Sequence, residues 1–174
     1  MRLPAQLGCA GYIDRVAKVT GMGSQCLWQV TKKGSVLMND CIFCKLANGV
    51  FPTNTVYEDE LFRVILDLGP ASPGHMLILP KEHYANLYEL PEEIAAEAMK
   101  LAKKLAIAAK AALNADGVNV VQNNEAAAGQ TVMHYHLHVI PRFEGVGEVP
   151  LWTPGTAEPT ELAEQAAKIA AKLQ

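Results

Sequence analysis

Hydrophobic and polar positions alternate in short runs in the part of the chain that follows residue 38. Apolar and β-branched residues gather at 55–57, 62–67 and 75–79, and acidic or Gly/Pro-rich stretches separate these runs. Short runs bounded by turn-forming residues are typical of β-strands. Their close spacing predicts antiparallel strands joined as hairpins.

A longer pattern at 90–114 predicts an amphipathic helix. Its apolar residues recur every three or four positions and form one stripe: Ile94, Ala98, Leu101, Leu105, Ala108 and Ala112. Pro91, Glu92 and Glu93 stand in the first turn, where a missing N–H costs little and negative charge suits the helix dipole. The helix is expected to end near Asn114, before Gly117.

The rest of the chain predicts two further strands and a last helix. The strands are expected at 118–122 and 132–140, and an alanine-rich helix is expected at about 160–173. Strands combined with one long helix predict an α+β fold. In it, an antiparallel sheet meander packs with the long amphipathic helix and a C-terminal helix.

The first 37 residues differ from the rest of the chain. They carry no sustained helical or strand period, and glycines interrupt them at positions 8, 11, 21, 23 and 34. Residues 1–37 are therefore predicted to be an N-terminal extension, either poorly ordered or not native, with Met38 as an alternative start. In a chain of 174 residues this leaves 38–174 for one domain.

Charge and cysteine content exclude several classes of protein. Residues 1–37 hold five Lys or Arg and one acid, so the net charge of −3 leaves −7 on residues 38–174, and we expect no nucleic-acid partner. No apolar run reaches about 18 residues, so we expect no membrane-spanning segment. Four cysteines are few for a disulfide-built chain, and the N-terminal residues lack a secretory signal, so we expect a cytoplasmic protein.

The histidines are the main candidates for catalytic or metal-binding residues. His134, His136 and His138 alternate with other residues, and on a strand such alternation places three imidazoles on one face. The residues between them would enter the opposite face: Tyr135, Leu137 and Val139. Burying three imidazoles is costly unless each has a partner or a task. The pattern therefore favours a three-histidine metal site or nucleophilic catalysis over an ordinary core.

The pattern His-x-His-x-His-x-x, with apolar or aromatic residues at each x, resembles the signature of the histidine-triad (HIT) superfamily of nucleotide hydrolases and transferases. The segments 41–45, 67–83 and 123–142 are similar to further segments of that family in the same order, so the resemblance covers roughly residues 40–143. It implies a HIT-like fold and a homodimer, with the long helix and a neighbouring strand at the interface. It also implies a purine nucleotide or dinucleotide substrate.

The activity that the resemblance implies is hydrolysis at the α-phosphorus of nucleoside phosphoramidates or dinucleoside polyphosphates. His136 would attack and form a nucleotidyl-histidine intermediate, which water then cleaves. A neutral imidazole suits this role when its other nitrogen donates to a fixed acceptor, which in the resembling sites is a backbone carbonyl. His138, supported by His75, would orient or protonate the leaving group and balance charge on the phosphoryl group.

Polar residues before the triad are candidates for holding phosphate oxygens. Gly129, Gln130 and Thr131 offer a closely approachable backbone, an amide and a hydroxyl. Asn124 is our choice for a further donor on the phosphate side, and Asn123 is the competing choice because loop length varies in the resembling family. A plain turn is the ordinary interpretation of the same residues.

The resemblance also points to residues around the nucleoside. Asp67 resembles the family's ribose contact, and a carboxylate suits two hydroxyl donors. Phe43, Leu46 and Leu68 would form apolar walls around the base, although such residues are as often ordinary core.

Cys41 and Cys44 have the spacing of a zinc knuckle, but two further ligands must come from elsewhere in the chain. In the resembling proteins that bind zinc, these are the histidine that closes the Pro-Lys-x-His segment and the first triad histidine. Here the resemblance implies His83 and His134. Two thiolates and two imidazoles leave no open position, so the zinc would be structural. The alternative is a pair of reduced cysteines at the end of a strand.

Three rival functions remain open from the sequence. The first is nucleotidyl transfer to an acceptor other than water, since the first half-reaction is the same. The second is a nucleotide-binding regulatory protein with little turnover. The third is an enzyme with an open three-imidazole metal site.

Overall fold

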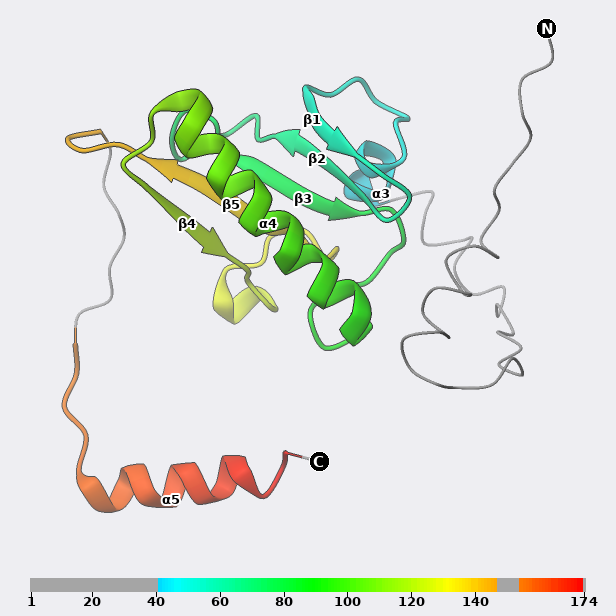
Figure 1. Ribbon diagram of the computed structural model, residues 1–174. Helices are drawn as coiled ribbons and strands as arrows, with labels where there is room; N and C mark the ends of the chain where they lie inside the picture. The colour runs from blue at the N-terminus through cyan, green and yellow to red at the C-terminus, as the bar shows by residue number, and fades with distance from the viewer. Residues whose placement is uncertain (1–40, 147–153, 174) are drawn as a thin grey trace, which may run out of the picture.

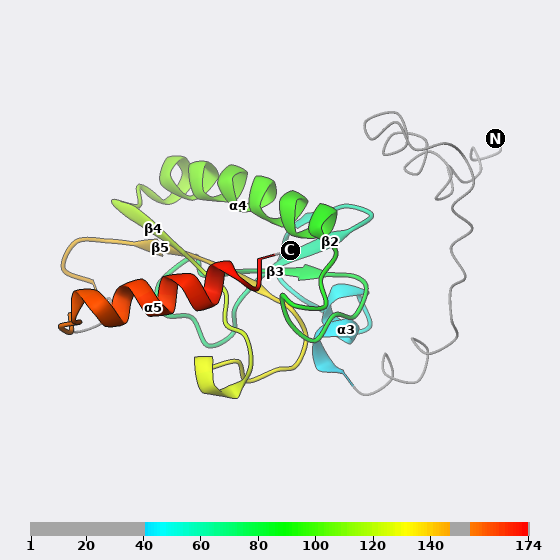
Figure 2. The same ribbon diagram turned by 90° about the horizontal axis from the view of Figure 1, so that it is seen from below.

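The computed structural model describes residues 41–146 and 154–173 (Figure 1). The predicted extension at 1–37 lies outside the described residues. Within them, an antiparallel sheet lies between a long helix on one face and a short helix on the other (Figure 2). The α+β class predicted from the sequence is confirmed.

In the described residues, five strands form the sheet in the order β1-β2-β3-β5-β4, and each neighbouring pair is antiparallel. Their bounds are Thr55–Glu58 for β1, Phe62–Leu66 for β2, Met76–Pro80 for β3, Gly117–Val121 for β4 and Leu137–Arg142 for β5. The predicted meander holds from β1 to β3, but β5 then lies between β3 and β4. The burial of the two strands agrees with this order: β5 is mostly buried and lies inside the sheet, whereas β4 is more exposed and lies at its edge.

β5 begins later than the sequence predicts. The predicted strand began at residue 132, whereas β5 begins at Leu137. Before it, the backbone N–H of Tyr135 donates to the carbonyl of Tyr84, 2.6 Å away. This bond to a distant loop takes the place of strand pairing, so the first two histidines of the triad lie outside the sheet ladder.

α4, Glu92–Leu113, lies across one face of the sheet (Figures 1 and 2). Its buried residues belong to the main core with side chains of β2, β3 and β5: Ala98, Leu101, Ala102, Leu105 and Ala109. The predicted stripe is correct as far as Leu105, but Ala108 and Ala112 are exposed and Ala109 is buried instead. Alanine offers so little apolar area that the pattern does not decide which alanine faces the sheet.

α3, Ile42–Ala47, is not predicted by the sequence and packs on the opposite face (Figure 2). Side chains alternate along β3, so Ile78 lies in the core with α4 while Leu77 and Leu79 pack with α3. His138 is the cross-strand partner of Leu77, which places its imidazole on the α3 face. One face of the sheet thus carries the main core, and the other carries the candidate site.

α5, Pro159–Ala170, forms close to the predicted range, but all of its residues are exposed. The expectation that this helix packs with the sheet is therefore wrong, and Leu162 and Ile169 keep more than half of their surface accessible. An alanine-rich stripe buries too little apolar area to fix a helix on a neighbour. In the part of the chain described here, no helix is both long and apolar enough to span a membrane.

Candidate functional site

The histidines gather on the α3 face of the sheet. The rings of His136 and His138 lie 4.9 Å apart between centroids, and Phe43 of α3 lies edge-on to His136 at 5.0 Å. His75, just before β3, has its ring 5.1 Å from that of His138. His136 and His75 are both buried. The candidate site is therefore built from α3, the start of β3 and the segment that leads into β5.

The loop before β3 has to turn tightly to bring His75 to the site. Gly74 has a φ of +79°, and a Cβ there would collide with the side chain of Leu113 at the end of α4. The hydroxyl of Ser72 donates to the carbonyl of Pro141 in β5, and the backbone N–H of His75 donates to the carbonyl of Ser72. Glycine at this turn is what lets the loop pack closely and hold the imidazole against β5.

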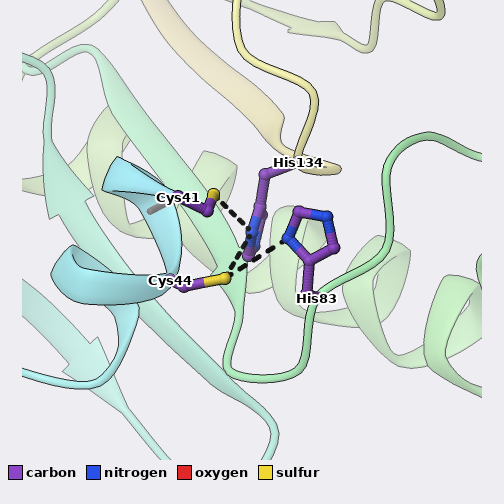
Figure 3. A group of neighbouring side chains, drawn as sticks. All are labelled: Cys41, Cys44, His83 and His134. Carbon is purple, nitrogen blue, oxygen red and sulfur yellow. Dashed lines mark hydrogen bonds between the residues drawn. The ribbon is translucent and has the colours of Figure 1, made fainter. Parts of the chain in front are cut away.

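Four potential metal ligands converge beside the triad (Figure 3). We call them the Cys/His cluster: Cys41 and Cys44 at the start of α3, His83 after β3 and His134 before β5. Their ligand atoms all lie within 4.8 Å of one another. The structure thus brings together the four residues that the sequence analysis assigned to a zinc site.

The distances within the Cys/His cluster suit a tetrahedral ion. Nδ1 of His134 lies 3.6 Å from Sγ of Cys41 and 3.4 Å from Sγ of Cys44. Nδ1 of His83 lies 3.3 Å from Sγ of Cys44. Zinc at about 2.3 Å from sulfur and about 2.0 Å from nitrogen would separate these atoms by about 3.5 Å. Two sulfurs and two ring nitrogens at this spacing fit zinc.

The far side of the His134 ring is fixed by the backbone. Its Nε2–H donates to the carbonyl of Pro80 at 3.1 Å, because a carbonyl oxygen only accepts. The lone pair is therefore on Nδ1, the atom that faces the two sulfurs. Burial lowers the pKa of His134 to about 4, although the hydrogen bond to Pro80 opposes this. The ring is thus neutral at pH 7, as a metal ligand must be.

Burial raises the pKa of the Cys44 thiol, and the neighbouring Cys41 raises it further through a hydrogen bond and its charge. The thiolate, not the thiol, is the metal ligand, so a cation that binds here must displace the proton. Metal binding at the Cys/His cluster would therefore release protons and depend on pH.

His136 is oriented by a carbonyl two residues before it. Its Nδ1 lies 2.7 Å from the carbonyl oxygen of His134, and because that oxygen only accepts, Nδ1 carries the proton. The lone pair of the neutral ring is then on Nε2. A backbone carbonyl is the acceptor that the family resemblance implied for a nucleophilic histidine.

A second chain of hydrogen bonds orients His138. The backbone N–H of Ala71 donates to Nδ1 of His75 over 3.1 Å, so the neutral His75 carries its proton on Nε2. Nε2 of His75 donates to Nδ1 of His138, 2.9 Å away. His138 therefore carries its own proton on Nε2. Of two adjacent rings, His136 offers a lone pair at Nε2 and His138 offers an N–H.

Burial keeps His138 and His75 neutral. It lowers the pKa of His138 to about 4, with smaller contributions from the charges of His136 and His75, and it also lowers the pKa of His75. Asp67 opposes the shift of His75, since its Oδ2 lies 3.7 Å from Nδ1 of that ring. That separation is too long for a hydrogen bond, and Nδ1 already accepts from Ala71, so the neutral form fits the geometry.

The loop predicted to hold phosphate follows a 3₁₀ turn, Ala126–Ala128, which Gly129 closes with a φ of +86°. Gln130 is buried, and its side-chain amide donates to two backbone carbonyls and accepts from the N–H of Glu125. Its backbone N–H donates to the carbonyl of Glu125. Gln130 thus holds the loop and keeps no donor for a phosphate, contrary to the sequence expectation, whereas Thr131 is exposed.

The two candidate asparagines are placed differently. The side chain of Asn124 accepts from the backbone N–H of Leu87 and donates to Oε1 of Gln122. The amide nitrogen of Asn123 lies 3.9 Å from where a Cβ on Gly129 would be, and its side chain has no hydrogen-bond partner among the described residues. Asn124 therefore braces the loop, and Asn123 keeps a donor beside it.

The residues predicted to surround the nucleoside are only partly brought together. Phe43 and Leu46 both pack against the smaller core under α3. Asp67 follows β2, and its Oδ1 accepts from the backbone N–H of Gly69 at 2.8 Å. Leu68 is 92% exposed, so within the described residues it does not share a packed surface with the other two apolar residues.

Sequence reasoning missed two backbone groups, the N–H of Ala71 and the carbonyl of Pro80. Each determines which ring nitrogen of a histidine carries the proton. Residue type does not reveal how a backbone N–H or carbonyl is used, since almost every residue carries both. Only the turns that contain them, Ala-Ser-Pro-Gly-His and Pro-Lys-Glu-His, mark their places in the sequence.

Comparison with known sequences finds a match to the HIT domain over residues 48–145. The chain is 38% identical to the adenosine 5'-monophosphoramidase of Saccharomyces cerevisiae over 135 residues, which are 77% of this chain and 83% of that protein. It is 43% identical to an adenylylsulfatase of Arabidopsis thaliana over 112 residues. That match covers 64% of this chain and 57% of the relative.

Solved structures show the same fold. A member of the HIT family of proteins from Bacillus subtilis matches with a TM-score of 0.73 and 37% identity, covering 78% of this chain and 98% of that chain. A Zn-bound histidine triad family protein from Mycobacterium smegmatis matches with a TM-score of 0.61 and 36% identity, covering 78% and 99%.

Proposed function

The chain belongs to the HIT family, and we propose that it is a nucleotide hydrolase that cleaves at the α-phosphorus of nucleoside phosphoramidates or dinucleoside polyphosphates. The observation that carries the proposal is a pair of adjacent rings, in which His136 offers a lone pair at Nε2 and His138 offers an N–H. A nucleophile beside a fixed donor suits displacement at phosphorus. The names of the two relatives above support a nucleotide substrate.

In the first step, the lone pair on Nε2 of His136 forms a bond to the α-phosphorus. The bond from phosphorus to the leaving nitrogen or oxygen breaks, and its electron pair stays with the leaving atom. The Nε2–H of His138 stabilises the negative charge that develops there, and the leaving group takes up a proton from solvent. The carbonyl of His134 stabilises the positive charge that attack produces on the His136 ring.

In the second step, water attacks the phosphorus of the nucleotidyl-histidine. The bond from phosphorus to Nε2 of His136 breaks, and water releases one proton as a nucleoside monophosphate forms. The two steps together consume one water and return both histidines to their starting forms. A ring whose proton is fixed on Nδ1 recovers its lone pair on Nε2 without rearrangement.

The proposal assigns nucleotide binding to residues near the two rings. The backbone at Gly129, the hydroxyl of Thr131 and the amide of Asn123 would contact phosphate oxygens, with Gln130 and Asn124 bracing the loop. Around the nucleoside, the base would contact Phe43 and Leu46, and the ribose would contact Asp67. Leu68 joins the base contacts only if nucleotide binding covers its exposed side chain.

The proposal includes structural zinc at the Cys/His cluster. The four ligands occupy all positions of a tetrahedral ion, so zinc there would join α3 to β3 and to the segment before β5 and would not activate water. The donor set and its spacing support zinc, as does the Zn-bound relative.

The proposal also includes a homodimer. β4 lies at an edge of the sheet with Val120 and Val121 exposed, and Ile107 on α4 is exposed as well. An unpaired edge and exposed apolar residues favour association with a second copy. A native mass of twice the chain's 18.8 kDa in solution tests this part.

The central experiment tests whether His136 becomes covalently bonded to phosphorus. The protein is mixed with an adenosine phosphoramidate, quenched, and mapped by peptide mass, and we expect an adenylyl group on His136. His136→Ala should lower kcat by about 10³-fold or more while adenosine monophosphate still binds. A wild-type protein that binds nucleotide without turnover would support the regulatory alternative, and transfer to an added acceptor in preference to water would support the transferase.

The leaving group provides a sharper test of His138. His138→Ala should slow phosphoramidate cleavage by about 10²-fold, because a basic leaving atom needs the N–H most. The same variant should slow adenylyl sulfate cleavage much less, since sulfate leaves readily without a donor. His138→Gln is the matched control, because its amide keeps an N–H near the same place. Equal losses on both substrates would contradict this role.

A further inference from the structure

His134 belongs to two parts of the site at once. Its Nδ1 faces the sulfurs of the Cys/His cluster, and its carbonyl oxygen accepts the Nδ1–H of His136. We propose that a cation held by the cluster fixes the orientation and tautomer of His136 through His134, which makes His134 a positioning residue for the reaction. The inference rests on the proposed function, in which His136 is the nucleophile.

The carbonyl of His134 is not fixed by the sheet. β5 begins at Leu137, so the ladder hydrogen bonds start after this residue. The neighbouring backbone bonds run from the N–H of His134 to Val132, at 2.8 Å, and from the N–H of Tyr135 to Tyr84. Among the described residues, the His134 carbonyl itself accepts only from the ring of His136. The N–H of Tyr135 belongs to the same planar peptide unit as this carbonyl, so its bond to Tyr84 restrains the carbonyl from one side and the His134 side chain restrains it from the other.

The His134 side chain is held at two ends. The residue is 0% exposed, and its Nε2–H donates to the carbonyl of Pro80. The other end, Nδ1, meets only thiol sulfurs at 3.4 and 3.6 Å, and sulfur is a weak hydrogen-bond partner. A cation at the cluster would replace these weak contacts with a metal–nitrogen bond. The ring of His134 and the backbone carbonyl of the same residue would then be restrained together.

A second route from the cluster to the nucleophile predicts a different result. α3 carries Phe43 next to Cys44, and Phe43 lies edge-on to the His136 ring at 5.0 Å. If the cluster acted only by fixing α3, loss of metal would mainly weaken nucleotide binding, because Phe43 is a base contact in the proposal. If the cluster acts through His134, loss of metal lowers kcat and changes the tautomer of His136.

The first experiment compares zinc-loaded and chelator-stripped full-length protein by ¹⁵N NMR of the histidine rings. We expect His136 to be a single Nδ1–H tautomer when loaded and a mixture when stripped. We also expect kcat to fall at least tenfold on stripping, with the Kd of adenosine monophosphate changing less than threefold. A stripped protein that stays folded and keeps the same His136 nitrogen shifts would overturn the inference.

Matched variants decide the question if the stripped protein unfolds. His134→Gln keeps a donor for the carbonyl of Pro80 but removes the metal ligand at Nδ1. His83→Gln also removes a metal ligand, but the backbone carbonyl of His83 is not hydrogen-bonded to His136. Both are measured at zinc concentrations that load them, with metal content assayed. His134→Gln should lose the tautomer preference and at least tenfold more kcat than His83→Gln. Equal losses would overturn the inference.

The outcome separates this inference from the proposed function. If the wild-type protein does not hydrolyse nucleotides, the proposed function has failed. The ¹⁵N comparison of loaded and stripped protein, and of the two variants, still shows whether the cluster controls the His136 ring.

Discussion

Two clusters of convergent side chains lie on the same face of the sheet, and they differ in what their histidines present. The Cys/His cluster and the group of Asp67, His75 and His138 each bring ligand atoms within 4.8 Å of one another. In the first, the lone pair of His134 points at the sulfurs. In the second, Nε2 of His75 is hydrogen-bonded to Nδ1 of His138 over 2.9 Å.

The difference comes from the backbone group that meets the outer nitrogen of each ring. A carbonyl at Pro80 draws the proton of His134 outward and leaves a lone pair facing inward. An N–H at Ala71 takes the lone pair of His75 and sends its proton inward, toward His138. One residue type thus presents a lone pair suited to a cation at the first cluster and, in our proposal, an N–H suited to an anionic phosphoryl group at the second.

Metal removal should have the largest effect and should separate the two clusters. Chelation or Cys44→Ser should lower the free energy of unfolding by about 4 kcal/mol or more, as linkage predicts for zinc at a thousand times its dissociation constant. Zinc content and denaturant unfolding measure this. His75→Ala should keep one zinc per chain. Loss of zinc in His75→Ala, or full zinc binding in Cys44→Ser, would contradict the assignment of the metal to the Cys/His cluster alone.

A change at His75 should have an intermediate effect, on catalysis and not on metal. His75→Ala removes the donor to Nδ1 of His138, and we expect kcat on a phosphoramidate to fall by about 10- to 100-fold. KM should change less than threefold. His75→Gln keeps an N–H near the Nε2 position and should recover most of the rate. Equal losses in the two variants would contradict a role for this N–H.

The smallest effect concerns stability in acid. Because the folded-state pKa of His138 is about 4, the unfolded chain takes up this proton first as pH falls below about 6.5. The free energy of unfolding is therefore unaffected by this group above pH 6.5 and falls as the pH declines toward 4. The expected loss between pH 6.5 and pH 5 is up to about 2 kcal/mol. Urea unfolding of wild type and His138→Gln at both values measures it. An identical decline in the variant would assign the loss to other groups.

Local patterns explain why most of the fold could be predicted. β1, β2, β3, β4 and α4 lie within one or two residues of their predicted ranges, because neighbouring residues carry a period of two or of 3.6. The start of β5 could not be predicted, since it depends on a bond between Tyr135 and the distant Tyr84. The central place of β5 and the exposed α5 depend likewise on packing between elements.

The candidate site divides in the same way. Residue type and spacing identified Cys41, Cys44 and the alternating triad, whereas the family resemblance pointed to His83 and His134 as further ligands and to His75. Residue type misled at Gln130, whose amide suggests a phosphate donor but is used by the backbone around it. Leu68 is 92% exposed, so its predicted contact with the base stays a prediction. Burial and hydrogen-bond use depend on segments that the sequence pattern does not bring together.

By itself the sequence determined that the triad histidines and the apolar residues between them separate to opposite sides, because side-chain direction alternates along an extended chain. Only the tertiary structure decided what each ring presents. On a neutral imidazole the proton sits on the nitrogen that meets an acceptor. For His134 and His75 that choice is made by backbone groups of turns, and folding alone brings those turns to the rings.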